Sequence, residues 1–176
     1  MSWKLAAAPL MLLLCSAADA PKGWQQLGPG HYLCTEPAGD YDNYPIAPLQ
    51  PGVPLKVLFR MVSENFDPRW TVEAAIFFDP PNGRSRVTIG KANNDRSHIY
   101  VALQPAHVPS EYWTILAMYR VTSNWIEVNL NMDAKGVVQV SSGRSFDKLS
   151  LRSTQPVPTT LHCNSGVFEV EVMPSA

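Results

Sequence analysis

Apolar and polar residues alternate at period two over residues 125–132, which read WIEVNLNM. Successive side chains of a β strand point to opposite sides, so this alternation predicts a strand with one buried side and one polar side. The buried side would hold Ile126, Val128, Leu130 and Met132. The polar side would hold Trp125, Glu127, Asn129 and Asn131, and this mixture raises the question of whether it binds a ligand.

Short alternating runs rich in β-branched and aromatic residues recur beyond residue 54. They predict strands at residues 55–62, 70–78, 86–91, 98–104, 113–122, 125–132, 137–141, 149–152 and 167–173. Turn-forming residues separate them, as in STQPVPTT at 153–160. No window after residue 20 shows the 3.6-residue period of an amphipathic helix. We therefore predict an all-β fold, an antiparallel two-sheet β-sandwich of the jelly-roll or lectin-like type.

Three of these runs carry continuous apolar stripes that a two-layer core would bury. The stripes occupy alternate positions of residues 70–78, 99–103 and 168–172. The first begins at Trp70, and in the third we expect the intervening Glu169 to face solvent. Together they predict sheets with one buried side each.

The length of 176 residues suits one domain with a substantial core. Residues 1–20 combine one lysine, an apolar run and small residues, which is typical of a secretory signal peptide cut after Ala18 or Ala20. Residues 21–54 are rich in Pro, Gly and Tyr without a period, and predict an extended N-terminal arm and loops. Residues 55–176 then form the β-sandwich domain of a secreted, extracellular protein.

Charge and hydropathy narrow the range of partners. The formal net charge is -1, from 14 Lys and Arg against 15 Asp and Glu, with no long run of one sign. Such a chain lacks the basic surface that nucleic acids require, so we expect no nucleic-acid partner. No segment after the signal approaches the ~20 apolar residues that span a bilayer, so we expect no transmembrane segment.

Two cysteines remain once the signal, with Cys15, is removed. In an exported chain, Cys34 and Cys163 most simply form one disulfide that ties the N-terminal segment to the last strand. Closing so long a loop contributes roughly 3–5 kcal/mol on the loop-entropy account. The alternative is a pair of unpaired thiols.

The motifs of common enzymes are absent from the sequence. There is no G-x-S-x-G, H-E-x-x-H, P-loop or G-x-G-x-x-G, and the four histidines are scattered, so we expect no catalytic residues, no metal and no cofactor. One catalytic alternative stays open, a glycosidase with paired carboxylates. Glu127 and Asp133 share one side of a predicted strand, and Glu73 lies on the polar side of another.

The polar side of residues 125–132 has the chemistry that a sugar requires. An aromatic ring packs on the C–H face of a pyranose, while amides and carboxylates bind its hydroxyl groups. We predict Trp125 as the stacking residue and Glu127 and Asn129 as hydroxyl partners. His98 and Arg120 would join them if their strands are adjacent. The alternative is that Trp125 covers the end of the sheet and the amides form a solvated edge.

Two stretches resemble the galectins, a family of jelly-roll lectins that bind β-galactosides. PLQPGVPLKVLFRM, residues 48–61, is similar to the opening strand of that fold. RVTSNWIE, residues 120–127, is similar to the family's Arg, Asn, Trp and Glu sugar contacts, and His98 can take the place of its histidine. Ile126 stands where galectins have a glycine. The resemblance implies a jelly-roll sandwich that binds sugar.

These observations favour a secreted, non-catalytic recognition module, most simply a carbohydrate-binding one with a glycan as its partner. The main alternative is a module that binds an extracellular protein. Its anchors would be the aromatic residues Tyr41, Tyr44, Tyr112 and Trp113, since such side chains are favoured at interfaces. A lipid carrier with a cavity between its sheets is a third alternative.

Overall fold

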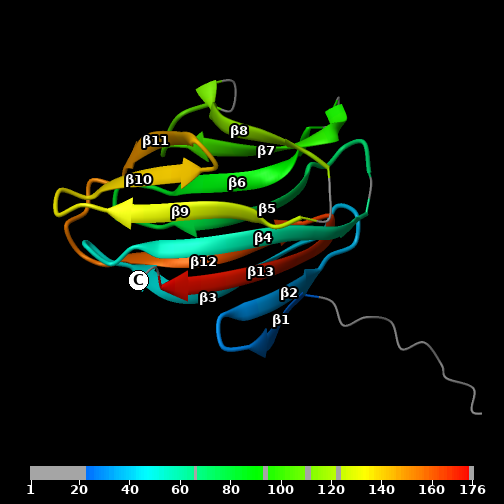
Figure 1. Cartoon of the computed structure of the whole chain (residues 1–176), viewed down its shortest axis with the longest axis horizontal. Coiled ribbons are helices and arrows are strands. Elements are labelled where there is room, and N and C mark those ends of the chain that lie inside the picture. Colours follow the sequence, from blue (N-terminus) through cyan, green and yellow to red (C-terminus); the bar gives the residue numbers. More distant parts are fainter. Residues whose placement is uncertain (1–22, 66, 93–94, 110–111, 122–123, 175–176) are drawn as a thin grey trace, which may run out of the picture.

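The computed structural model describes residues 23–65, 67–92, 95–109, 112–121 and 124–174, and the regular elements in them are β strands. The seven-stranded sheet has the order β1 (Gly23–Gly28), β2 (His31–Thr35), β13 (Gly166–Pro174), β4 (Leu55–Glu64), β9 (Ile126–Met132), β10 (Val137–Ser142) and β11 (Ser145–Ser150). The six-stranded sheet has the order β3 (Tyr41–Leu49), β12 (Val157–Asn164), β5 (Val72–Phe78), β6 (Ser85–Ala92), β7 (Asp95–Gln104) and β8 (Thr114–Arg120). Figure 1 shows the two sheets packed face to face.

The core lies between the sheets and is made by alternate residues of the strands. Phe59 of β4 and Val128 of β9 face Ile76 of β5 and Val101 of β7, and all four belong to one cluster of buried apolar side chains. Neighbouring strands pair antiparallel in both sheets. The predicted antiparallel β-sandwich is therefore confirmed, and so is the buried side of residues 125–132.

The N-terminal segment differs from its prediction. Residues 21–54 were expected as an arm and loops, but β1 and β2 extend one sheet and β3 forms the edge of the other. The expectation is wrong because Pro, which weakens a strand inside a sheet, is tolerated on an edge strand such as β3, and because the inner strand β2 contains neither Pro nor Gly. The predicted signal peptide, residues 1–20, lies outside the described residues. Within the described part, no helix is long and apolar enough to cross a membrane.

Two further elements were misplaced by the sequence pattern. The stretch 153–160 was expected as a break, yet its second half begins β12, which lies between β3 and β5. Trp70 was expected at the start of an apolar stripe. It lies instead in the turn before β5, where its N–H donates to the Asp67 carbonyl and its exposed fraction is 45%. The stripe therefore begins at Val72.

A disulfide joins Cys34 to Cys163 as predicted, with the Cα atoms 6.5 Å apart. Cys34 lies on β2 of the seven-stranded sheet and Cys163 on β12 of the six-stranded sheet, and both are fully buried. The bond therefore ties the N-terminal segment to the penultimate strand, not to the last strand as expected. It links the two sheets through the core.

Candidate functional site

The outward side of the six-stranded sheet carries polar and aromatic residues in rows across the strands. Residues directly opposite one another on neighbouring strands have adjacent side chains. One row runs through Thr160, Phe77, Arg86 and Gln104. The next runs through His162, Ala75, Thr88 and Ala102, and a third through Asn164, Glu73, Gly90, Tyr100 and Met118. We call Glu73, Phe77, Arg86, Tyr100, Gln104, His162 and Trp113 the Trp113 face.

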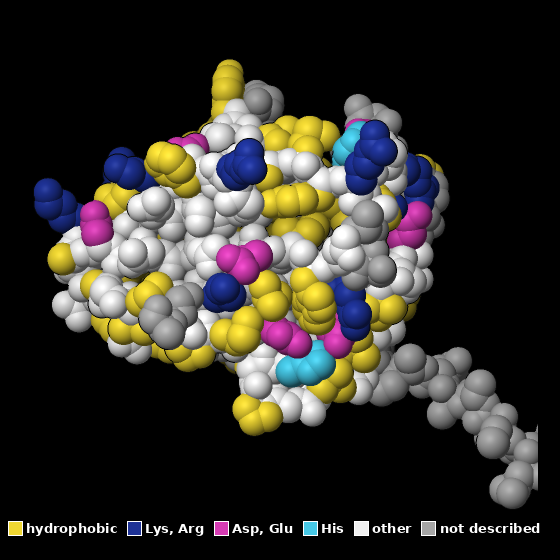
Figure 2. All heavy atoms as spheres, in the orientation of Figure 1, with side chains coloured by type: hydrophobic (Ala, Val, Ile, Leu, Met, Phe, Trp, Pro, Cys, Tyr) yellow, Lys and Arg dark blue, Asp and Glu magenta, His cyan; other side chains and the backbone are white. Residues whose placement is uncertain are grey.

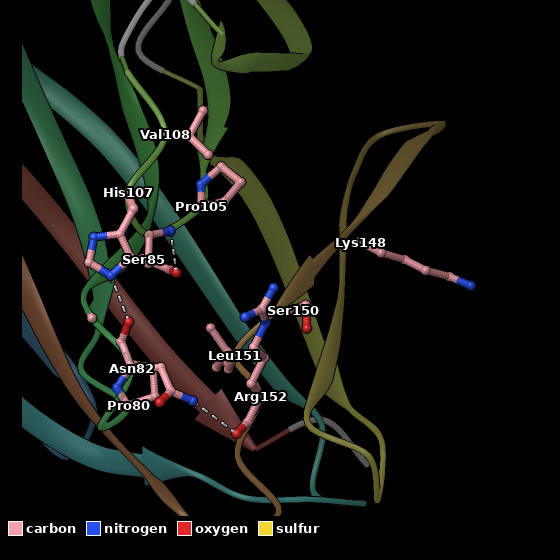
Figure 3. A pocket seen from close by; sticks show the side chains of 12 residues that line it. Pro80, Asn82, Ser85, Pro105, His107, Val108, Lys148, Ser150, Leu151 and Arg152 are labelled. Carbon is pink, nitrogen blue, oxygen red and sulfur yellow. Dashed lines mark hydrogen bonds between the residues drawn. The ribbon is translucent and has the colours of Figure 1, made fainter.

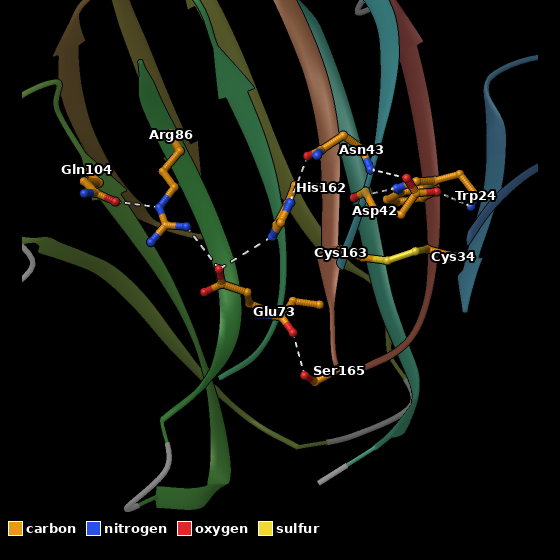
Figure 4. A network of polar contacts seen from close by, with 11 residues as sticks. Trp24, Cys34, Asp42, Asn43, Glu73, Arg86, Gln104, His162, Cys163 and Ser165 are labelled. Atoms are coloured by element: carbon orange, nitrogen blue, oxygen red, sulfur yellow. Dashed lines mark hydrogen bonds and ion pairs between the residues drawn. A yellow bond between two sulfur atoms is a disulfide. The ribbon is translucent and has the colours of Figure 1, made fainter. Parts of the chain in front are cut away.

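Arg86 is the centre of the Trp113 face (Figure 4). Its Nε donates to Gln104 Oε1 at 2.5 Å, and its Nη1 donates to Glu73 Oε1 at 3.1 Å. Its guanidinium carbon lies 4.6 Å from the centroid of the Trp113 ring and 5.8 Å from that of Phe77. A planar guanidinium can do both, because it donates in its plane and stacks through its faces. Arg86 is therefore held in one orientation.

Glu73 is a buried carboxylate on this side of the sheet, with a side chain that is 8% exposed. Burial raises the pKa of Glu73, although the charge and hydrogen bond of Arg86 oppose the shift. Burial also raises the pKa of Tyr100 to about 12, and the charge of Glu73 adds to this. Gly90 lies between the two, and a Cβ there would approach the Glu73 Cβ to 2.9 Å. The glycine therefore lets Glu73 sit against the sheet.

His162 extends the network toward the edge strand β3. Its Nδ1 and Asn43 Oδ1 are 2.9 Å apart, which makes Nδ1 the donor. Its ring stacks on Phe77 with centroids 4.7 Å apart, and its Nε2 lies 3.9 Å from Glu73 Oε1. Burial lowers the pKa of His162 to about 4, helped by the positive charges of Arg86 and Arg84. His162 is therefore neutral near pH 7, and Nε2 can accept a hydrogen bond.

Two buried polar atoms near Arg86 have no hydrogen-bond partner among the described residues, namely Thr88 Oγ1 and Trp113 Nε1. Thr88 follows Arg86 by two positions on β6, and Trp113 stacks on the Arg86 guanidinium. An unpaired buried polar group costs about 1–3 kcal/mol.

The Trp113 face is bordered by exposed residues on both sides. Tyr41 on β3 is 66% exposed and Met118 on β8 is 55% exposed. Between them, Ala75, Thr88 and Ala102 point outward yet are almost fully buried. Exposed large side chains therefore stand on the two edge strands, and the row of Ala75, Thr88 and Ala102 between them is small and covered.

Three of the predicted ligand-binding residues lie together on the outward side of the other sheet. Glu127 Oε1 accepts from Asn129 Nδ2 at 2.8 Å, and Glu127 Oε2 lies 3.2 Å from Lys56 Nζ. The Arg60 guanidinium carbon lies 4.9 Å from the centroid of the Trp125 ring. We call Lys56, Arg60, Trp125, Glu127 and Asn129 the Trp125 face. Figure 2 shows this side of the molecule, where acidic and basic side chains are interspersed with apolar ones over β4, β9 and β13.

Three carboxylates on or beside the Trp125 face are bound to hydrogen-bond donors. Hydrogen bonds from Asn129 and Lys56 lower the pKa of Glu127, and those from the backbone of Val137 and Lys135 lower the pKa of Asp133. Glu169 was expected to face solvent, but its side chain is only 14% exposed because Arg60 and His31 bind it. Burial opposes these two hydrogen bonds, which nevertheless lower the pKa of Glu169.

The other two predicted ligand-binding residues, His98 and Arg120, lie on the six-stranded sheet. They are cross-strand neighbours on β7 and β8. Neither strand is adjacent to β9, so the groove expected from adjacent strands is not formed and the predicted set of five is divided between two sheets. His98 Nδ1 lies 2.9 Å from both Asp95 Oδ2 and Ser97 Oγ. Hydrogen bonds from Ser97 and His98 lower the pKa of Asp95 to about 2.

Sequence reasoning missed Arg86 and His162 as site residues and assigned no ligand to Glu73. A signal for Glu73 exists, because it is the one charged residue in the otherwise apolar β5. Arg86 and His162 carry no comparable signal, since their proximity to Glu73 depends on strand order. Among the described residues, no group of three His, Cys, Asp or Glu is placed to hold a metal ion.

The aromatic anchors considered for a protein partner are dispersed. Tyr41 and Tyr112 are 66% and 68% exposed, and Trp113 stacks on Arg86. Tyr44 packs instead against Tyr32, with ring centroids 5.1 Å apart.

The fold is thus a jelly-roll or lectin-like sandwich with a polar and aromatic surface on each sheet. Among similar solved structures is a congerin II Y16S single mutant, with a TM-score of 0.47, 10% identity, and coverage of 77% of this chain and 100% of that chain. Congerin II is a galectin, the family that the sequence resembles.

Two further similar structures are those of a lyase and of a carbohydrate binding module. One is an alginate lyase from Pseudomonas aeruginosa, with a TM-score of 0.49, 12% identity, and coverage of 70% of this chain and 64% of that chain. The other is carbohydrate binding module CBM66 from Bacillus subtilis, with a TM-score of 0.48, 5% identity, and coverage of 88% and 96%. No family model matches the chain, and no curated protein matches it. These likenesses concern the arrangement of strands and say nothing of the ligand.

Proposed function

We propose that the protein is a non-catalytic carbohydrate-binding module that uses the Trp113 face. The observation that carries the proposal is the placement of aromatic rings and a fixed guanidinium, carboxylate and amide network on one sheet face. Sugars need such a combination, because their C–H faces pack on rings and their hydroxyl groups need directional partners. The predicted glycan partner is kept, and its location moves from Trp125 to the six-stranded sheet.

Burial favours the Trp113 face over the Trp125 face as the primary surface. Hydrogen bonds to partly desolvated groups are stronger than those to groups in water. Groups that are already held in place also lose less side-chain entropy on binding. Glu73 and Arg86 satisfy both conditions, since their side chains are 8% and 22% exposed. The Trp125 face, with Glu127 and Asn129, is a second candidate surface for the same function.

The arrangement of acids supports binding without hydrolysis. A glycosidase places two carboxyl groups across the scissile bond, about 5–10 Å apart. Glu73 lies on one sheet, whereas Glu127 lies on the other and Asp133 binds the backbone N–H groups of the turn after β9. The remaining enzyme hypothesis predicts that any hydrolysis of an oligosaccharide is lost in Glu73→Gln or Glu127→Gln.

We also propose that the protein is secreted. The supporting features are the signal-like residues 1–20 and the disulfide between Cys34 and Cys163, a bond that persists in oxidising compartments. The test is the N-terminal sequence of the chain recovered from the medium of expressing cells. We expect it to begin after Ala18 or Ala20, and retention of the full chain inside the cell would contradict export.

A glycan array with matched tryptophan variants tests the binding proposal. We expect wild-type protein to bind a defined set of glycans, Trp113→Ala to lose at least tenfold in affinity, and Trp125→Ala to stay within threefold. Trp113→Phe, which keeps an aromatic ring, should retain most of the binding, and circular dichroism should show the native fold in every variant.

Each contrary result has a distinct meaning. If Trp125→Ala abolishes binding and Trp113→Ala does not, the Trp125 face is the site and our placement is wrong. If the wild-type protein binds no glycan, carbohydrate binding is wrong. An extracellular protein ligand then becomes the leading hypothesis, to be tested with Tyr41→Ala and Tyr112→Ala.

A further inference from the structure

A pocket of about 540 Å³ lies at one end of the sandwich, where three segments of the chain meet (Figure 3). These segments are residues 80–85, 105–108 and 148–152. Small-molecule sites in proteins typically measure about 300–1,000 Å³, so the pocket is large enough for a small ligand. No residue of the Trp113 face or the Trp125 face lines it.

The lining of this pocket combines apolar walls with polar groups. Its apolar members are Pro80, Pro105, Ala106, Val108 and Leu151. Its polar members include Asn82, Ser85, His107, Ser150 and Arg152, and none of the lining residues is acidic. Ser85 Oγ accepts a hydrogen bond from the Ala106 N–H at 3.0 Å, which leaves the hydroxyl hydrogen free to be donated. The pocket thus offers hydrogen-bond donors between apolar walls.

Arg152 supplies a positive charge that the described residues do not neutralise. Figure 3 shows its side chain extending toward Ser150 in the pocket, whereas the Lys148 side chain points away. The nearby Arg84 differs, because its Nε lies 2.6 Å from Asp79 Oδ1. No carboxylate of the described chain forms an ion pair with Arg152. An uncompensated guanidinium over a partly apolar cavity favours an anion.

The backbone around the pocket is strained. His107 and Arg152 have φ values of 62° and 51°, in the left-handed region that non-glycine residues rarely adopt. His107 Nε2 donates to the Asn82 carbonyl at 2.9 Å, which helps to hold the strained residue. Gly83 lies beneath that ring, and a Cβ there would approach His107 Nε2 to 2.7 Å. Backbone strain of this kind collects at ligand-binding sites.

We infer that this pocket binds a small organic anion, a carboxylate carried on an apolar body. Arg152 pairs with the carboxylate, and the hydroxyl groups of Ser85 and Ser150 donate to it. The apolar body packs on Pro105 and Leu151. Such a ligand needs both a negative charge and an apolar body. A neutral alcohol lacks the charge, and an inorganic anion lacks the apolar body.

Titration of the ¹⁵N-labelled chain, without its signal segment, with sodium hexanoate tests the inference by NMR. We expect saturable shifts of the amides of Ser85, Ala106, Ser150 and Leu151. Hexanol, which lacks the charge, should bind at least tenfold more weakly, and sodium sulfate, which lacks the apolar body, should do so too. Equal binding of hexanol would remove the role of the charge, and equal binding of sulfate would remove that of the apolar walls.

A pair of variants assigns the charge to one residue. Arg152→Gln should weaken hexanoate binding at least tenfold. The Lys148 side chain points away from the pocket, so the affinity of Lys148→Gln for hexanoate should stay within twofold of wild type. Arg152→Lys keeps the charge and should bind within about fivefold of wild type. The spectra of all three report whether the fold is intact. Hexanoate binding that is unchanged in Arg152→Gln, or shifts that spread away from the pocket, would overturn the inference.

Discussion

The Trp113 face and the Trp125 face contain the same kinds of side chain but differ in how far these are removed from water. Each has an arginine over a tryptophan ring, with Arg86 at 4.6 Å from the Trp113 centroid and Arg60 at 4.9 Å from the Trp125 centroid. Each also pairs a glutamate with a cation. Glu73 is 8% exposed, whereas Glu127 is 45% exposed.

This difference in burial shifts the pKa values of the two glutamates in opposite directions. Burial raises the pKa of Glu73 despite Arg86, whereas hydrogen bonds from Asn129 and Lys56 lower the pKa of Glu127. The charge of Glu73 is therefore tolerated only because a partner is fixed beside it. The charge of Glu127 is solvated and needs no partner. The same residue types thus make a rigid network on the six-stranded sheet, where burying the charges costs free energy, and a solvated, adaptable surface on the seven-stranded sheet.

The largest expected difference is in stability. Removing one member of a buried ion pair costs about 3–5 kcal/mol, so Arg86→Met should lower the free energy of unfolding by that amount. Lys56→Met breaks the exposed pair with Glu127 and should cost about 0–1 kcal/mol. Urea denaturation measures both. Adding Glu73→Gln to Arg86→Met should restore part of the loss, and equal costs for the two single variants would contradict the comparison.

The next effect concerns acid stability. The pKa of His162 is about 4 in the fold and 6.5 ordinarily, so below pH 6.5 the unfolded chain binds the proton more readily. Stability is then lost as the pH falls from 6.5 to 4, by up to about 3 kcal/mol for this one group. His162→Gln should lack this loss in urea titrations at pH 7 and pH 4.5.

Glu73 and Glu127 provide internal checks on the acid experiment. The raised pKa of Glu73 has the opposite effect on acid stability, since the folded chain binds this proton more readily than the unfolded chain. Glu73 is present in both wild type and His162→Gln, so the difference between their acid losses isolates the contribution of His162. Glu127 has a lowered pKa, so its contribution to stability is present above about pH 4.5 and is lost as the pH falls below that value. Glu127→Gln should therefore leave the loss of stability between pH 6.5 and 4.5 unchanged. An acid loss in His162→Gln as large as in wild type would rule out a role for that ring.

The smallest expected effect is the response to salt. Double-mutant cycles should give a coupling of a few tenths of a kcal/mol for Lys56 and Glu127 in 0.05 M NaCl, because exposed pairs are weak. At 1 M NaCl the Debye length falls to about 3 Å, and this coupling should vanish. The coupling of Arg86 and Glu73 should persist. Parallel loss of both couplings would show that the two faces are equally solvated.

Period-two patterning was sufficient to predict the sandwich, because a strand with one buried side leaves a local trace in the sequence. Residues 125–132 show this, with Ile126 and Val128 in the core as expected. The N-terminal segment left no such trace, since Pro45 and Pro48 interrupt β3 at the edge of its sheet. The prediction for Trp70 was wrong for a related reason, because a turn at Asp67 breaks the alternation just before β5.

The site was harder to predict than the fold because it depends on pairing between distant strands. Trp125, Glu127 and Asn129 lie on or beside one strand, so the sequence could place them together. His98 and Arg120 could be assigned to the same surface only by assuming a strand order. The contact between Glu73 and His162 joins residues on β5 and β12, and no periodicity within either strand reveals it.

The disulfide also determines how the domain would respond to a pulling force. It closes a loop with a sequence separation of 129 residues, from Cys34 to Cys163. Tension applied at the two ends of the domain would pass directly across the bond between β2 and β12. Only β1, the start of β2 and β13 could extend, while most of both sheets would carry no load. The oxidised domain is therefore mechanically clamped, and reduction would release the enclosed segment to unravel under the same force.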